Sequence, residues 1–252
     1  MVSDDIDDNN IEDNNIDDYN IDDNNIHDNN IHVEMMSDAF FEFCSEHIFP
    51  KFSHEFYSIS CSTFLHEINQ NRFEDENAKL FKRKIELLLS DNIVMIPLCS
   101  NLHHVLLFKV GSDCYFIDSL NVDVKSYPLI IKTYNIIKEL NLDKNNKQIS
   151  LTQINVETQT DGCTCGYRVF IYMLLIYSIN PFNPDILKKV QFKLDTFKKL
   201  ESVMKSFKEF QKEVLVPSHS SLSKSHKELI KEFSNKSYFE ILQILHSVID
   251  SL

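Results

Sequence analysis

The sequence predicts an α+β fold in which a central mixed sheet is flanked by helices and followed by a helical C-terminal extension. Two observations support this class. Short apolar runs separated by turn residues between residues 93 and 120 indicate three consecutive strands. Apolar residues at helical spacing indicate helices at 185–213, 220–233 and 236–251, and the continuous apolar run at 169–176 is long enough for a buried helix.

The other elements follow from local signals along the chain. Ser37 is a typical helix N-cap and precedes a helix at 39–49, and the spacing at 77–89 predicts a second amphipathic helix. Residues 128–140 have the pattern of a further helix, and 148–156 that of a strand that leads into a tight turn. Together with the central strands, these helices complete the predicted α+β order.

Charge is distributed unevenly along the 252 residues. Residues 1–34 hold twelve acidic side chains and no lysine or arginine, so almost all of the net charge of -13 belongs to this segment. It repeats five residues with one isoleucine each, too little apolar surface to offset the entropy of ordering, and we expect a disordered low-complexity tail. A short pentapeptide β-solenoid is the alternative. The predicted division is this tail at 1–34, a core at 35–182 and a helical extension at 183–252.

A cluster of glycine and cysteine marks one turn of the chain. Only three glycines occur, and two of them, Gly162 and Gly166, lie on either side of Cys163 and Cys165. Such a cluster indicates backbone that turns tightly. Because the apolar helix follows directly, Cys165 is expected at its first turn, where unpaired amides and the helix dipole favour a thiolate. Cys163 is expected to be an idle loop cysteine, with a resolving or regulatory thiol as the alternative.

A nucleophilic cysteine needs a base, and the base needs an orienting acceptor. One predicted strand opens with His103 and His104, a hairpin follows at Gly111, and the next strand ends in Asp118. Antiparallel pairing would bring the start of the first strand beside the end of the second, so we expect His103 and Asp118 to be neighbours. Paired Cys-x-x-Cys units and a glycine-rich phosphate loop are absent from the sequence, and we expect no metal and no cofactor.

In their order, these residues resemble the ubiquitin-like proteases of clan CE, which include the sentrin-specific proteases, the adenovirus protease and bacterial effector deubiquitinases. The resemblance covers about residues 90–180 and consists of Ile96-Pro97, His103-His104-Val105-Leu106, Tyr115-Phe116-Ile117-Asp118-Ser119-Leu120, and Gln159 six residues before Cys165-Gly166. It implies a papain-like cysteine protease fold with a catalytic core at 35–182. It further implies Cys165 as the nucleophile, His103 as the general base, Asp118 as the group that orients the imidazole, and Gln159 as a donor to the oxyanion.

The sequence also departs from the family pattern. The family usually has tryptophan directly after the histidine, whereas this chain contains no tryptophan and has His104 there, so the cover over the substrate must be built otherwise. The usual aspartate before the nucleophile is Thr164. Of the two adjacent histidines, His103 is favoured as the base because it keeps the family's spacing from Pro97 and places Leu106 on the family's leucine.

The resemblance implies a cysteine isopeptidase that cleaves ubiquitin or a ubiquitin-like modifier after its C-terminal Gly-Gly, with ubiquitin favoured over SUMO or NEDD8. Two alternatives stay open. A Yop-type acetyltransferase uses a similar triad, although that branch usually has glutamate where this chain has Asp118. A non-catalytic module that binds the modifier would keep the fold without the reaction.

The expected surroundings follow from composition and from the resemblance. Six cysteines, no secretory signal and thiol chemistry indicate a soluble protein of a reducing intracellular compartment, or an effector secreted into a host cell if the source is a bacterium. The longest apolar run, 169–179, is too short to cross a bilayer. The expected partners are ubiquitin or a ubiquitin-like modifier and its conjugates, not nucleic acid, and the protein is expected to be a monomer.

Overall fold

The structure is a computed structural model that describes seven parts of the chain: 33–52, 57–58, 93–100, 102–145, 148–179, 181–215 and 226–252. The acidic repeat up to residue 32 and the helix expected at 77–89 lie outside the described residues. The expected order of strands and helices can therefore be compared with the structure from residue 33 onwards, with those gaps.

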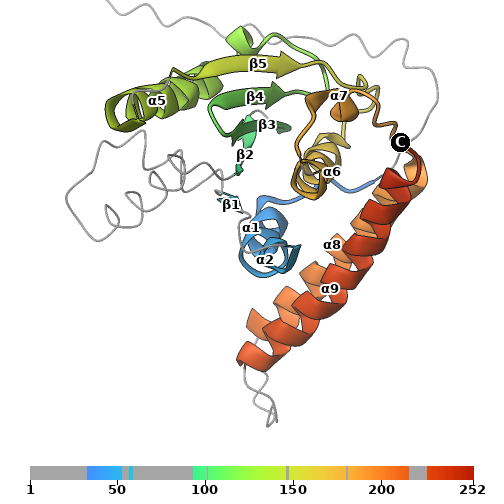
Figure 1. Cartoon of the computed structure of the whole chain (residues 1–252). Coiled ribbons are helices and arrows are strands. Elements are labelled where there is room, and N and C mark those ends of the chain that lie inside the picture. The colour runs from blue at the N-terminus through green and yellow to red at the C-terminus, as the bar shows by residue number, and fades with distance from the viewer. Residues whose placement is uncertain are drawn as a thin grey trace, which may run out of the picture. The chain divides into compact units, whose positions relative to one another are not determined.

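Within the described residues, five strands form one mixed sheet (Figure 1). They lie in chain order: β1 (Tyr57–Ser58), β2 (Val94–Ser100), β3 (His103–Val110), β4 (Asp113–Ile117) and β5 (Ser150–Ile154). The central pairs, β2 with β3 and β3 with β4, are antiparallel, whereas β1 pairs with β2 and β4 pairs with β5 in parallel. The predicted central mixed sheet is confirmed.

The turn between β3 and β4 fixes the register on which the site depends. Gly111 has a φ of +57°, in the left-handed region that favours glycine, and an added Cβ there would meet nothing within 4 Å. The glycine is therefore needed for its backbone conformation and not for space. Beyond this turn, Val110 pairs with Asp113 and Leu106 with Ile117. The start of β3 thus lies next to the residues that follow β4, as the sequence predicts.

Alternating side chains of β3 reach two different apolar clusters, one on each face of the sheet. Val105 and Leu107 belong to the cluster that contains Ile130 and Ile137 of α5 (Pro128–Asn145). The intervening Leu106 belongs to the cluster built around α6 (Cys165–Ser178). With both faces covered, β3 is apolar along most of its length, which explains why its sequence does not alternate.

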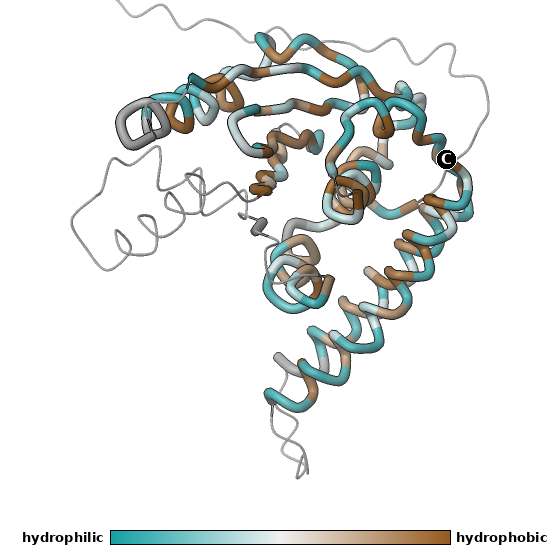
Figure 2. Tube along the Cα trace, in the orientation of Figure 1, coloured by the Kyte–Doolittle hydropathy of each residue, from teal (hydrophilic) through white to brown (hydrophobic). Residues whose placement is uncertain are grey.

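Helix α6 is the centre of the larger cluster. All of its residues from Cys165 to Ile176 are buried, and its trace is mostly brown in Figure 2. Against it pack α1 (Asp38–His47) and the short α2 (Phe49–Phe52). The N-cap predicted at Ser37 is confirmed, because its hydroxyl accepts a hydrogen bond from the Phe40 backbone amide at 3.4 Å. The buried helix predicted from the apolar run is also confirmed.

The single helix predicted at 185–213 is wrong. The structure has α7 (Pro184–Leu187) and, after a break, α8 (Leu194–Leu215). Tertiary contacts in the break compete with the helical hydrogen bonds. The backbone amide of Phe192 donates to the Glu157 carboxylate at 3.1 Å, and the Phe192 ring lies under the guanidinium of Arg168, 4.7 Å from its central carbon. These contacts hold the chain away from helical geometry where the sequence pattern continues through it.

The two helices predicted at 220–233 and 236–251 are one helix, α9 (His226–Ile249). Residues 220–225 of the first predicted helix lie outside the described residues, and the serines between the two predicted helices fit inside α9. Ser234 and Ser237 are buried, and the Ser234 hydroxyl donates to the Lys231 carbonyl at 3.1 Å, which satisfies it within the helix.

Helices α8 and α9 lie side by side (Figure 1). Aromatic rings join them to each other and to α1. Phe210 and Phe233 stack with ring centroids 4.4 Å apart, and Phe43 of α1 lies 4.8 Å from Phe207. The C-terminal helices thus share the apolar cluster of α6. Val33 and Glu34, which the predicted division placed in the tail, also contact this part of the molecule, since Val33 is buried and the Glu34 amide donates to Glu201 at 2.9 Å.

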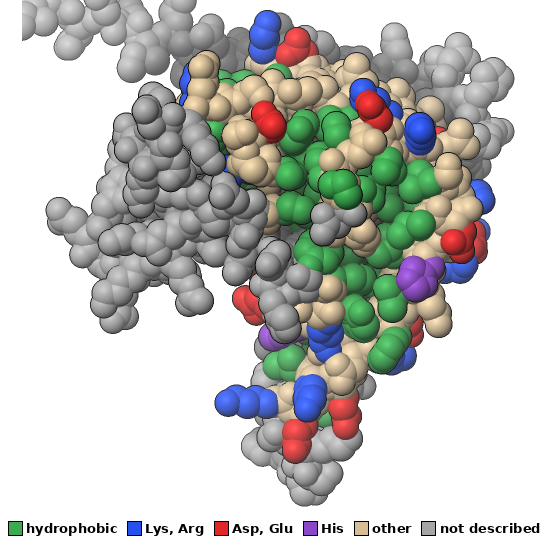
Figure 3. Space-filling view, viewed as in Figure 1, with side chains coloured by type: hydrophobic (Ala, Val, Ile, Leu, Met, Phe, Trp, Pro, Cys, Tyr) green, Lys and Arg blue, Asp and Glu red, His purple; other side chains and the backbone are tan. Residues whose placement is uncertain are grey.

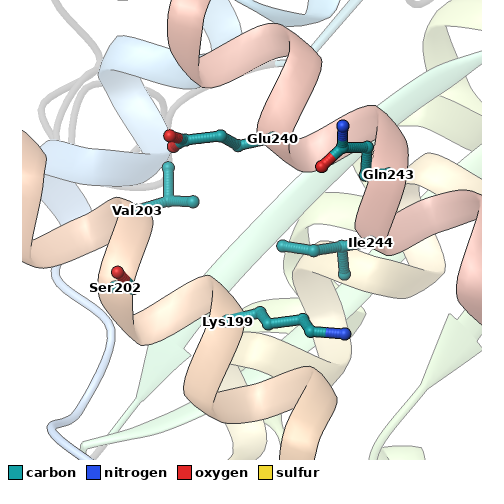
Figure 4. A pocket seen from close by; sticks show the side chains of 6 residues that line it. All are labelled: Lys199, Ser202, Val203, Glu240, Gln243 and Ile244. Atoms are coloured by element: carbon teal, nitrogen blue, oxygen red, sulfur yellow. The ribbon is translucent and has the colours of Figure 1, made fainter.

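Apolar side chains also reach the surface. On the face seen in Figure 3, they gather in the middle, with many of the charged side chains toward the edge. A separate pocket of about 250 Å³ lies between α8 and α9 (Figure 4) and is lined by Lys199, Ser202, Val203, Glu240, Gln243 and Ile244. It contains none of the predicted site residues. In the described part of the chain, every helix is too short or too polar to pass through a bilayer.

Candidate active site

Cys165 is the first residue of α6, as the sequence predicts. Thr164 is the N-cap of the helix, and the Cys165 side chain is nearly buried, with 2% of the residue exposed. Its sulfur lies 3.9 Å from Nδ1 of His104 and 3.9 Å from the carbonyl oxygen of Leu102. A thiol at this place faces the unpaired amides and the positive end of the helix dipole, which stabilise its ionised form.

The turn before the helix is organised by Asp161. One carboxylate oxygen accepts hydrogen bonds from the backbone amides of Cys163 at 3.0 Å and Thr164 at 2.7 Å, and the other accepts from the Thr164 hydroxyl at 2.7 Å. Burial would raise the pKa of Asp161, but the Thr164 hydroxyl and these amides lower it. Asp161 was not among the residues predicted from the sequence. The signal was the pair Asp161-Gly162 just before a helix, which is typical of an aspartate that caps its own turn.

Arg168 supports the same turn from one helical turn beyond the cysteine. It is buried, and its Nε donates to the Thr164 hydroxyl oxygen at 3.2 Å while a terminal nitrogen donates to the Glu157 carboxylate at 3.1 Å. Asp161, Thr164 and Arg168 therefore form one connected chain of hydrogen bonds behind Cys165. No sequence pattern marks Arg168, because its partners come from three different segments.

His103 and Asp118 are brought together by the antiparallel register. Nε2 of His103 lies 2.6 Å from a carboxylate oxygen of Asp118, which is fully buried. The other contacts of the carboxylate are with the backbone amides of Leu120 at 2.9 Å and Val122 at 3.1 Å and with the Tyr127 hydroxyl at 2.8 Å. Burial would raise the pKa of Asp118, but the hydrogen bonds from His103, Leu120 and Tyr127 lower it. Asp118 is thus held as a carboxylate in a fixed orientation.

Tyr127 was not found from the sequence. It lies immediately before α5, just after the 3₁₀ turn η1 (Val124–Ser126), and only the folding back of this loop brings its hydroxyl to Asp118. The loop is fastened by Asn121, whose side chain exchanges hydrogen bonds with the backbone of Val156 at 2.9 and 3.1 Å. Asn121 has a φ of 54°, a left-handed conformation that asparagine tolerates better than most residues. The loop after Asp118 is therefore tied to the segment that leads to Gln159.

Gln159 lies where the loop after Asp118 meets the turn that precedes α6. Its side-chain oxygen accepts a hydrogen bond from the Ser119 hydroxyl at 2.7 Å, and its amide nitrogen donates to the backbone carbonyl of Asp161 at 2.5 Å. Its backbone amide donates to the Ser119 carbonyl at 2.7 Å. The side-chain amide of Gln159 is thus held through both its oxygen and its nitrogen, and the nitrogen points at the turn before Cys165. Its role as a donor to an oxyanion stays a prediction.

The pKa values of the Cys165 thiol and the His103 imidazole are shifted in opposite directions, so that the thiol becomes the stronger acid of the two. Burial would raise the pKa of the Cys165 thiol, but hydrogen bonds from His103 and His104 lower it to about 6. Burial would lower the pKa of His103, but its hydrogen bonds to Asp118 and Cys165 raise it to about 9. Between these values the site favours a thiolate and an imidazolium. Because Nε2 of His103 is bound to Asp118, its Nδ1 is the nitrogen left for the thiol proton.

The structure therefore brings together Cys165, Asp118 and both adjacent histidines, and it places Gln159 on the turn that precedes the cysteine. Metal chemistry was not expected here. Among the residues that the structure describes, no group of three or more His, Cys, Asp and Glu side chains is arranged to hold an ion. The site combines a thiol with a lowered pKa and an imidazole with a raised one. Such a pair is typical of activated cysteines.

Three solved structures similar to this chain concern SUMO proteases and a ubiquitin-bound effector. SUMO protease Ulp1, with its catalytic cysteine oxidised to a sulfenic acid, has a TM-score of 0.44 and 12% identity, covering 84% of this chain and 79% of that one. The catalytic domain of the Chaetomium thermophilum Ulp1-like SUMO protease has a TM-score of 0.43 and 12% identity, covering 68% and 72%. The Xanthomonas campestris effector protein XopD bound to ubiquitin has a TM-score of 0.39 and 11% identity, covering 81% and 92%.

No protein-family model matches the chain, and no curated protein matches its sequence. Because the three TM-scores are all below 0.5, the function proposed below rests on the geometry of the site. The resemblance to the ubiquitin-like proteases of clan CE consists of the order and spacing of the motifs between residues 90 and 180.

Proposed function

We propose that this protein is a cysteine isopeptidase that cleaves ubiquitin or a ubiquitin-like modifier after its C-terminal Gly-Gly, with ubiquitin as the favoured modifier. One observation carries the proposal. At the first turn of a buried helix, a thiol whose pKa two histidines lower to about 6 lies 3.9 Å from one of them, His104, while the other, His103, lies 2.6 Å from a buried aspartate. This arrangement supplies a nucleophile, a proton acceptor and an orienting group in the order that the reaction requires.

In the proposed reaction, His103 holds the proton of Cys165, and the thiolate attacks the carbonyl carbon of the terminal glycine. The developing oxyanion is stabilised by the backbone amide of Cys165, which lies at the helix N-terminus, with the Gln159 amide as its proposed partner. His103 then protonates the departing lysine amine, which leaves a thioester on Cys165. Water, deprotonated by His103, hydrolyses the thioester and restores the enzyme. Asp118 remains a carboxylate throughout and stabilises the imidazolium.

Exposed apolar side chains next to the catalytic residues suit an extended apolar substrate segment. Leu102, directly before His103, is 74% exposed, and Leu120, two residues after Asp118, is 43% exposed. Leu102 has a φ of 63°, a conformation uncommon for a residue other than glycine. We propose that these leucines contact the residues of the modifier that precede its Gly-Gly, in place of the tryptophans that this chain lacks.

The proposed organisation is a catalytic core at 35–182 that acts as a monomer, with the helical extension at 183–252 and the acidic tail at 1–34 as appended parts. The aromatic contacts of α8 and α9 with α1 support a structural role for the extension. The extension is proposed to hold α1 and α6 in place.

An electrophilic probe tests the proposed function. Ubiquitin, SUMO and NEDD8, each carrying a reactive group in place of the terminal carboxylate, should be offered to the purified protein in parallel, with Cys165→Ala and Cys163→Ala as matched variants. We expect ubiquitin to label the protein and the Cys163 variant, and not the Cys165 variant. Preferred labelling by SUMO would change the assigned modifier. The absence of labelling by all three, together with acetyl transfer from acetyl-CoA to a protein, would replace the isopeptidase with an acetyltransferase.

A further inference from the structure

A second histidine lies at the reacting sulfur. His104 is the second residue of β3 and is buried, and its Nδ1 is 3.9 Å from Sγ of Cys165. This distance is within the range of a hydrogen bond to sulfur. His103 contacts the same cysteine but also Asp118, so the two neighbouring imidazoles have different partners.

The position of the His104 ring is fixed by its neighbours. It stacks on Phe41 of α1, with ring centroids 5.4 Å apart and planes 26° from parallel. It also lies over Gly166, where an added Cβ would come within 3.4 Å of Nδ1 and within 2.8 Å of Cβ of Met36. Glycine at this position therefore leaves room for both Met36 and the imidazole. A side chain held in this way meets the sulfur in one orientation.

We propose that His104 is a second catalytic histidine, which donates a hydrogen bond from Nδ1 to the sulfur of Cys165 and stabilises the thiolate while His103 holds the proton. This inference rests on the proposed function of the same site. No proton passes to His104. The thiol proton moves to Nδ1 of His103, the negative charge stays on sulfur, and the proposed hydrogen bond from Nδ1 of His104 points at that charge.

The titratable groups around the sulfur are few among the described residues. His103 and His104 come from β3, and Asp118 acts through His103. Burial raises the pKa values of Cys163 in the turn and of Tyr127 before α5, and the negative charge of the thiolate adds to both shifts. Of these groups, His103 and His104 are the two whose side chains lower the pKa of the Cys165 thiol through hydrogen bonds. Removing one of the two donors should therefore raise the pH at which the thiolate forms.

The variants His104→Leu and His104→Asn separate the hydrogen bond from the packing. Both lose the ring that stacks on Phe41, and the two replacement side chains have nearly the same shape, but only asparagine can donate a hydrogen bond. The rate of alkylation of Cys165 by iodoacetamide should be measured against pH in a Cys163→Ser background, with the modified peptide read by mass spectrometry. The unaltered protein should show a midpoint at about pH 6.

We expect the leucine variant to alkylate about tenfold more slowly at pH values below the midpoint, with an unchanged plateau at high pH, because a hydrogen bond to a charged group contributes about one pKa unit or more. The asparagine variant should stay close to the unaltered protein. Equal midpoints in the two variants would overturn the proposal and leave His104 as a packing residue. If the leucine variant does not unfold cooperatively on heating, His104→Phe, which keeps a ring against Phe41 and lacks the donor, takes its place.

Alkylation needs no protein substrate, so this result is independent of the modifier. A protein that cleaves none of the modifiers can still show the shifted midpoint, and an active isopeptidase can fail to show it. If the enzyme is active, the acidic limb of its profile of kcat/KM against pH should move to higher pH in the leucine variant, together with the alkylation midpoint. A lowered rate at every pH, with no movement of the limb, is the signature of a structural role.

Discussion

The two sides of the candidate active site are built on different principles. On the strand side, His103 and Asp118 are joined by a contact of 2.6 Å between charged groups, and the carboxylate is fully buried. On the turn side, Asp161 holds backbone amides and the Thr164 hydroxyl in place before the helix that begins at Cys165. In the proposed reaction, the strand side holds the proton of the Cys165 thiol. The turn side fixes the position of the backbone that carries Cys165. Substitutions on the two sides should therefore have different signatures.

The largest effect is expected from Asp118→Asn. The amide cannot stabilise an imidazolium, and its nitrogen replaces one of the two oxygens, so that a donor faces the backbone amide of either Leu120 or Val122. We therefore expect kcat to fall about 10³- to 10⁴-fold. The upper limb of the pH profile should also move toward lower pH, because Asp118 helps to raise the pKa of His103. Asp123→Asn is the matched control, since it removes the same charge from an exposed residue of the same loop. A loss of only a few-fold would exclude the proposed role of Asp118.

The pH profile of the unaltered protein tests the strand side without a substitution. The proposed reaction needs the Cys165 thiolate, which is lost as pH falls through about 6, and the His103 imidazolium, which is lost as pH rises through about 9. We expect kcat/KM to be bell-shaped between these values and to fall about tenfold for each pH unit on the acidic side. The two groups are coupled, so the midpoints belong to the pair. A profile that keeps rising above pH 9 would mean that the imidazolium is not required.

Asp161→Asn tests the turn side. The amide keeps one oxygen for the backbone amides of Cys163 and Thr164 but presents a donor to the Thr164 hydroxyl. The free energy of unfolding should fall by about 1 to 2 kcal/mol, and kcat/KM should fall about tenfold through misplacement of Cys165. Thermal unfolding and kcat/KM measured across pH give both quantities. A shift of either pH limb would show that Asp161 acts on the proton as well, and the distinction between the two sides would fail.

The difference between the two sides also explains what could be predicted from the sequence. His103 and Asp118 are fifteen residues apart and are connected by one hairpin, so a single turn at Gly111 fixes their register and their proximity. Cys165 was predictable because a glycine-rich turn and an apolar run meet at that residue. Both inferences need only short-range patterns and the rules of strand pairing.

The rest depends on contacts between distant segments, which no local pattern contains. Tyr127 reaches Asp118 only through the path of a loop. The break before α8 exists because Glu157 and Arg168, far back in the chain, bind Phe192, while the periodicity of that segment continues through it. The spacing from Pro97 favoured His103 over His104 as the base. That choice of one histidine for one role does not exclude a different role for the other. Its contact with Cys165 depends on Phe41 and Gly166 together.

The smallest effect is expected where the two sides meet. Ser119 follows Asp118 on the strand side, and its hydroxyl donates to the side-chain oxygen of Gln159 on the turn side at 2.7 Å. Ser119→Ala should lower kcat/KM about threefold by loosening the Gln159 amide, whereas Gln159→Ala should cost on the order of 100-fold if this amide faces the oxyanion.

A double-mutant cycle decides whether Ser119 acts through Gln159. In the Gln159→Ala background, Ser119→Ala should have no further effect on kcat/KM, because the group that it orients is gone. Ser178→Ala, which removes a hydroxyl bound within α6 to the Leu174 carbonyl, is the control and should give the same small change in both backgrounds. If the effects of Ser119→Ala and Gln159→Ala simply multiply, Ser119 serves the loop after Asp118, and the amide of Gln159 is held by Asp161 alone.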